Sequence, residues 1–99
     1  MSRGPDIGTR LARAIERMRP GVAVVERSAT PWASVTFSGA RHRIGVSVAD
    51  APGAAKWIER LPEAEFAIPG HIVADLAVTA TARRGGRVAV TIEALTVET

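Results

Sequence analysis

Two polar residues that could do chemistry stand four positions apart in the stretch "FAIPGHIVADLAVTATA", residues 66–82. His71 could act as a general base oriented by Asp75, which requires heavy atoms about 3 Å apart. Along a strand, four residues span about 13 Å at roughly 3.3 Å per residue, so the two side chains would share a face without touching. Only a helix would bring them into contact. The secondary structure of this segment therefore decides whether a dyad exists.

The segment is compatible with both structures, but three features favour a strand. In a helix, Ile72, Leu76 and Ala80 would align on one face. However, the β-branched residues of "VTAT" are stiff in helices, a glycine pair follows, and the next segment, "RVAVTIE", is a clear strand that needs a partner. We predict a strand, with His71 and Asp75 together on the face opposite Ile72.

Other catalytic and ligand-binding signatures are missing from the sequence. There is no GxSxG, HExxH, GxGxxG or Walker-type motif, and "ARRGGR" does not precede a helix, so it is predicted to be a turn. The chain has two histidines and no cysteine, which disfavours a protein metal site. His42 falls on the predicted core face of its strand. We expect no catalytic residue, cofactor or metal, and an enzyme that uses His71 with Asp75 or His42 is the least supported hypothesis.

Length and composition indicate one globular domain spanning residues 1–99. The chain is 46% hydrophobic and 23% charged, which is ordinary for a soluble domain. No apolar run approaches the roughly 20 residues that cross a bilayer, and the opening "MSRGPDIGTR" has no signal-peptide core. We expect a cytoplasmic protein.

Positive charge is concentrated in the first half of the chain. The net charge is +3, and Lys56 is the only lysine among 13 Lys and Arg residues. Residues 50–66 are acidic instead. A basic block of this kind indicates possible nucleic-acid binding, and the residues that would contact phosphate are Arg10, Arg13, Arg17 and Arg19, with Arg41 and Arg43. No aromatic stacking platform accompanies them, which disfavours single-strand and RNA recognition.

Two helices are predicted from their apolar spacing and their end signals. The first carries a stripe of Ile7, Leu11, Ile15 and Met18, with Pro5 and Asp6 in its first turn and "RPG" at its end. The second is "DAPGAAKWIERLP", where Asp50 is the expected cap and Pro52 the first-turn residue. Trp57 falls on the apolar stripe of this second helix and is expected in the core.

Five strands are predicted: "VAVVE", "WASVTFS", "RHRIGVSV", residues 71–82 and "RVAVTIE". A two-residue loop at Gly39–Ala40 would set Phe37 opposite His42 and Val35 opposite Ile44. A three-residue loop at residues 84–86 would match the later apolar faces, and a change of phase predicts a β-bulge near Glu93–Ala94. The order αβββαββ is that of an α+β two-layer sandwich, a five-stranded antiparallel sheet with two helices on one face.

The face of the sheet that two helices leave uncovered is the most informative predicted surface. Its side chains are small, half of them apolar, with arginine at one end. Trp32 either covers a sheet edge or anchors a partner. We expect a non-enzymatic interaction or accessory module that forms a homodimer through the open face or an edge strand. The candidate surface comprises Trp32, Arg41, Arg43, His71 and Asp75.

The stretches "VTFSGARHRI", "LPEAEFAIPGHIVADLAV" and "VTIEALTVE" resemble a group of short bacterial proteins, a resemblance that implies no activity. The αβββαββ order is also similar to that of the secretion-chaperone fold, which binds protein clients as a dimer. Those chaperones usually end in a further helix, which this sequence does not predict, and they tend to be acidic. The analogy implies a protein partner and nothing about residues.

Overall fold

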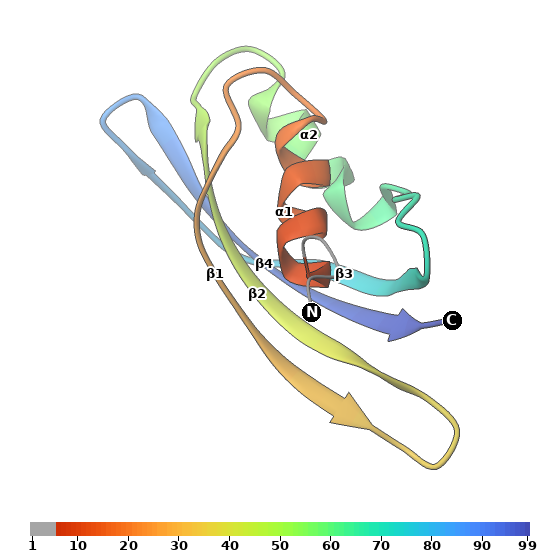
Figure 1. Ribbon diagram of the computed structural model, residues 1–99. Coiled ribbons are helices and arrows are strands. Elements are labelled where there is room, and N and C mark those ends of the chain that lie inside the picture. Colours follow the sequence, from red (N-terminus) through yellow and green to blue (C-terminus); the bar gives the residue numbers. More distant parts are fainter. Residues whose placement is uncertain (1–5) are drawn as a thin grey trace.

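The computed structural model of this 99-residue chain describes residues 6–99, so Pro5, expected in the first helical turn, lies outside the described part. The elements are, in order, α1 (Ile7–Glu16), β1 (Ala23–Ala33), β2 (Ser38–Ala49), α2 (Ala54–Arg60), the 3-10 turn η1 (Leu61–Glu63), β3 (His71–Arg84) and β4 (Arg87–Glu98). The strands form one antiparallel sheet in the order β1-β2-β4-β3. Both helices lie on the concave side of this curved sheet (Figure 1). The α+β class is confirmed.

The sheet has four strands, so the prediction of five is wrong. All but the first residue of "VAVVE" and the first two residues of "WASVTFS" belong to a single strand, β1, which continues through Pro31. Proline lacks the backbone N–H that a central strand needs, but an edge strand leaves one side of its backbone unpaired. β1 is an edge strand, and Pro31 lies opposite Ala40 of β2.

The turn between β1 and β2 is formed by residues 34–37 and not by Gly39–Ala40. Ala33 pairs with Ser38, and the Ser34 hydroxyl accepts a hydrogen bond from the Phe37 amide at 3.0 Å. Ser34 therefore stabilises the turn by a local side-chain bond. As a result Val35 and Phe37, predicted to face the core opposite Ile44 and His42, lie in the turn and are exposed.

The β3–β4 hairpin also differs from its prediction. Its loop is the two-residue Gly85–Gly86, both with positive φ, 59° and 77°, and Arg84 pairs with Arg87. β4 is regular, so the bulge expected near Glu93–Ala94 is absent from it. The register shifts fall instead in the edge strands, at Ala74 and Thr79 of β3 and at Val25 of β1. Bulges in edge strands are common and discourage uncontrolled edge-to-edge pairing.

The core lies between the helices and one face of the sheet. The α1 stripe is confirmed for Leu11 and Ile15, which are fully buried, whereas Met18 lies beyond the helix and is partly exposed. Asp6 caps α1 by accepting from the Thr9 amide at 2.8 Å. The strand residues of the core are Ile44, Val46, Val48, Leu76, Val88, Val90, Ile92 and Ala94.

The second helix starts later than predicted. Its N-cap is Gly53, with φ of 90°, and no side chain caps it. Asp50, the expected cap, forms an ion pair with Arg83 at 3.2 Å instead. Trp57 is partly buried and packs against the core, as expected. None of the helices in residues 6–99 has the length and apolarity required to cross a bilayer.

Candidate functional site at the uncovered end of the sheet

The helices are too short to cover the whole sheet. The ten residues of α1 span about 15 Å, whereas strands of 11 to 14 residues extend about 40 Å. The β1–β2 hairpin projects past the helices (Figure 1). We call this end of the sheet, formed by residues 29–42, 71–73 and 95–98, the distal end. The face toward the helices is the inner face and the opposite one is the outer face.

The structure separates His71 from Asp75. His71 pairs with Glu98 and Asp75 pairs with Leu95. These partners stand three positions apart on regular β4, so they point to opposite faces, and the bulge at Ala74 carries that change into β3. The strand prediction for residues 71–82 is confirmed, but the expectation that His71 and Asp75 share a face is wrong. His71 lies on the inner face and Asp75 on the outer face.

His42 is on the inner face, as predicted, and is only 3% exposed. Its Nε2 atom lies 2.9 Å from the hydroxyl of Thr96, which is fully buried. The Thr96 hydroxyl donates to the Ala40 carbonyl at 3.4 Å. Because a hydroxyl has a single proton to donate, we assign the proton of the neutral ring to Nε2, which donates to Thr96. This leaves the Nδ1 lone pair available as an acceptor.

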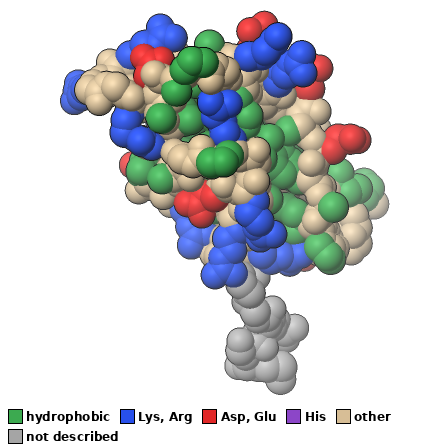
Figure 2. Space-filling model, turned by 90° about the horizontal axis from the view of Figure 1, so that it is seen from above, with side chains coloured by type: hydrophobic (Ala, Val, Ile, Leu, Met, Phe, Trp, Pro, Cys, Tyr) green, Lys and Arg blue, Asp and Glu red, His purple; other side chains and the backbone are tan. Residues whose placement is uncertain are grey.

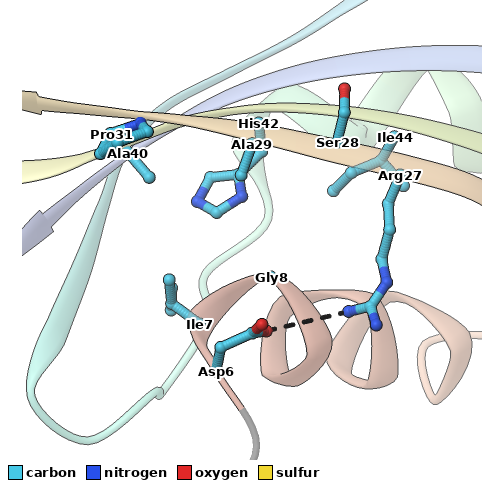
Figure 3. Close-up of a pocket in the computed structure, with 10 residues that line it drawn as sticks. All are labelled: Asp6, Ile7, Gly8, Arg27, Ser28, Ala29, Pro31, Ala40, His42 and Ile44. Carbon is cyan, nitrogen blue, oxygen red and sulfur yellow. Dashed lines mark ion pairs between the residues drawn. The ribbon is translucent and has the colours of Figure 1, made fainter.

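The Nδ1 edge of His42 faces a cavity of about 380 Å³ between the first turn of α1 and the inner face of β1 and β2. Figure 3 shows the ring reaching from β2 toward Ile7 and Gly8. Arg27 closes one side of this cavity: its guanidinium donates to the Thr9 hydroxyl at 2.6 Å and lies 4.0 Å from the carboxylate of Asp6. The residues lining the cavity are Asp6, Ile7, Gly8, Arg27, Ser28, Ala29, Pro31, Ala40, His42 and Ile44.

Burial lowers the pKa of His42, and nearby His71 lowers it further, while Asp6 acts in the opposite direction. A His pKa below its usual 6.5 in the folded chain means that the unfolded chain takes up the proton first as the pH falls. We therefore expect the free energy of unfolding to be highest above pH 6.5 and to fall as the pH is lowered toward the folded-state pKa. Urea unfolding between pH 7.5 and 5.0 measures this.

The His42→Gln variant removes the titrating group, and its stability is expected to depend less on pH over that interval. His71→Gln removes the smaller contribution of the neighbouring histidine and keeps the contribution of burial, so its stability should still fall as the pH is lowered over that interval. An NMR titration of the His42 ring protons measures the folded-state pKa of His42 directly. A His42 pKa at or above 6.5, or equal slopes in His42→Gln and wild type, would contradict the assignment.

Apolar side chains lie on the outer face of the distal end and in the adjoining turn. One row across the sheet consists of Trp32, Gly39, Val97 and Ile72. The Trp32 indole lies over Gly39, where a Cβ would be 3.1 Å from the ring. Ile72 is 54% exposed, and in the adjoining turn Phe37 is 56% exposed and Val35 is fully exposed. We call Val35, Phe37, Ile72 and the Trp32 side chain the distal apolar cluster.

The candidate interaction surface predicted from the sequence is partly assembled. Arg41, Leu95 and Asp75 form the next row of the outer face, and Arg43, Glu93 and Ala77 form the row after it. Trp32, Arg41, Arg43 and Asp75 thus share one face. His71 does not belong to it, and its Nδ1 atom is buried on the inner side without a hydrogen-bond partner among the described residues.

The residues of the nucleic-acid hypothesis do not form one surface. α1, which carries Arg10 and Arg13 and ends before the C-cap Arg17, covers the inner face, whereas Arg41 and Arg43 lie on the outer face. Two of the guanidinium groups bind backbone carbonyls, that of Arg10 at Pro69 and that of Arg19 at Pro52. Figure 2 shows basic side chains in separate groups with apolar and acidic side chains between them. Nucleic-acid binding stays a prediction that the arrangement does not favour.

Sequence reasoning missed several residues of this region. Thr96 bonds His42 because β4 and β2, which are far apart in the sequence, are paired. Arg27 contacts the cavity because β1 lies beside the first turns of α1. Val35 and Phe37 are predicted in the core, although "SVTF" begins with a serine, Ser34, that can close a turn with its own side chain. That serine was the signal that could have placed the turn correctly.

Within residues 6–99, no group of three or more His, Cys, Asp or Glu side chains is arranged to hold a metal ion. The four-stranded order αββαββ also differs from the order on which the analogy with secretion chaperones rested. Comparison of the chain with protein-family models, curated proteins and solved structures gives no match.

Proposed function

We propose that the protein is a non-enzymatic interaction module of the cytoplasm that associates with a second copy of itself through the distal end of the sheet. The observation that carries this proposal is the distal apolar cluster. Single exposed apolar residues are normal on protein surfaces. Here Val35, Phe37 and Ile72 are exposed at the distal end, which also holds Trp32, and covering them would release about 25 cal/mol per Å² of apolar surface.

The charges beside this cluster suit a second copy. Arg41 and Arg43 lie on β2, and Asp75 and Glu93 lie beside them on β3 and β4. In an isologous dimer each copy presents the same patch to the other. A two-fold axis between the basic and acidic columns would set the arginines of one copy against the carboxylates of its partner. A polyanion would meet these carboxylates as well, which disfavours it as the occupant.

The size of the face is adequate for such a dimer. The chain measures 44 × 26 × 20 Å, and stable interfaces bury roughly 800 Å² per partner. The broad side of the molecule can supply that area. The separation of His71 from Asp75 onto opposite faces supports the non-enzymatic part of the proposal, because the one dyad suggested by the sequence is not assembled.

Phe37→Asp is expected to abolish self-association, because it places a charge in the distal apolar cluster at a position where folding buries little surface. Val25→Asp is the matched control: Val25 is 66% exposed and lies on β1 near its opposite end. Sedimentation equilibrium over a range of protein concentrations measures both variants and the wild type.

The expected pattern is a dimer for the wild type and for Val25→Asp, and a monomer for Phe37→Asp, with all three folded by circular dichroism. A wild type that stays monomeric at the highest concentration would sink the proposal. Equal weakening by the two variants would also count against it, since the interface would then not be at the distal end.

A further inference from the structure

The cavity beside His42 combines one hydrogen-bond acceptor with an apolar wall. The His42 side chain is 3% exposed, and its Nδ1 atom has no hydrogen-bond partner among the described residues. This Nδ1 atom is not one of the buried polar atoms that lack a partner, so it is accessible from the cavity. Nε2 is held by Thr96 at 2.9 Å, which fixes the orientation of the ring and keeps the Nδ1 acceptor directed toward the cavity.

The rest of the lining determines what would fit there. The side chains of Ile7, Ala29, Pro31, Ala40 and Ile44 make most of the wall apolar. The two charged groups, Asp6 and Arg27, lie 4.0 Å apart and offset each other's charge. Burial lowers the pKa of His42, so its ring is neutral at neutral pH. The cavity therefore has no net charge to attract an ion.

The volume agrees with a small molecule. About 380 Å³ lies within the roughly 300–1,000 Å³ of ligand pockets. A second hollow of about 260 Å³, lined by His71 and Glu98 among others, adjoins it, and both are bounded by Ile7, Pro31 and Ala40. The two hollows therefore lie side by side on the distal part of the inner face.

We propose that this cavity binds a small, uncharged, mainly apolar molecule that donates one hydrogen bond, from a hydroxyl or an N–H group, to Nδ1 of His42. The apolar body of the ligand lies against Ile7, Pro31 and Ala40. The site is on the inner face, so it does not depend on self-association through the outer face.

Indole and 1-methylindole are suitable probes, because they differ by the one N–H donor. Titrated into the full ¹⁵N-labelled chain, indole is expected to shift the amides of Ala29 and Ala40 and the Nδ1 resonance of His42. Loss of a single hydrogen bond corresponds to about a tenfold change in affinity. 1-Methylindole is therefore expected to bind at least about tenfold more weakly and to leave the Nδ1 resonance in place.

Two variants locate the site. Ala29 lines the cavity but is exposed, so Ala29→Leu fills the space without disturbing the core and should abolish indole binding. Ala89→Leu adds the same volume on the exposed outer face of β4 and should leave it unchanged. Three outcomes would overturn the proposal: no shifts up to the solubility limit of indole, equal affinities for the two probes, or indole binding that survives Ala29→Leu.

Discussion

Replacement of Gly39 by Ala is expected to lower the free energy of unfolding by about 3 kcal/mol or more, at the upper end of the cost of overpacking. A Cβ at this position would lie 1.9 Å from the carbonyl oxygen of Thr96 and 3.1 Å from the Trp32 ring. The first contact is with backbone, which cannot rotate away. β2 and β4 would have to separate at Gly39 and Val97, and the bonds that hold the distal end together would be weakened.

Gly45→Ala is the matched control in the same strand. Its Cβ would lie 2.9 Å from Cγ of Glu26, the flexible part of an exposed side chain, which can move to another rotamer. We expect a change within about 1 kcal/mol, since a tolerated Gly→Ala substitution also reduces the entropy of the unfolded chain. Urea unfolding of both variants tests the pair. If Gly39→Ala and Gly45→Ala are equally stable, β2 and β4 do not lie as close together at Gly39 as the structure has them.

Replacement of Leu11 by Ala is expected to cost about 3–5 kcal/mol, the range measured for fully buried leucines. Leu11 is completely buried and is part of the core cluster with Ile44 and Ile92. Small domains have a total stability of only about 5–15 kcal/mol. Removal of three side-chain carbons from α1 would therefore remove a large share of the free energy that holds this helix on the sheet.

Arg13→Ala is the control for Leu11→Ala, because Arg13 is exposed on the same helix and alanine is a good helix former. It should change the stability by less than about 0.5 kcal/mol. A shift of about 4–8 °C in Tm accompanies each kcal/mol in a domain of this size, so thermal unfolding separates the two variants clearly. A Leu11→Ala protein as stable as Arg13→Ala would mean that α1 does not pack on the sheet through this stripe.

The apolar periodicity of the sequence was sufficient to predict the helix and strands whose buried residues recur at a regular spacing. The α1 stripe of Leu11 and Ile15 follows directly from a three- and four-residue spacing. Alternation placed His42 on the core face, and the β-branched residues near Val78 selected a strand for residues 71–82. Local chemistry also accounts for the turn at Pro69–Gly70: Gly70 has φ of 82°, and the His71 amide donates to the Ile68 carbonyl at 3.1 Å.

Tertiary structure decided what depends on a strand's position in the sheet. A proline such as Pro31 would interrupt a central strand but is compatible with an edge strand. The sequence does not show which strands lie at the edges of the sheet. The sequence does not show where an edge strand has a bulge either. Each bulge adds one residue and so moves every later side chain to the opposite face. The bulge at Ala74 is the reason that His71 and Asp75 point to opposite faces.

The candidate sites are also products of the tertiary structure. Thr96 and His42 stand 54 positions apart and meet because β2 and β4 are neighbours. Val35 and Phe37 are exposed because Ser34 closes a turn at residues 34–37, before the Gly39–Ala40 loop that the sequence suggested. Periodicity records only which side of a segment is apolar. The strands are longer than the helices, and the distal end becomes an uncovered surface only when these segments pack together.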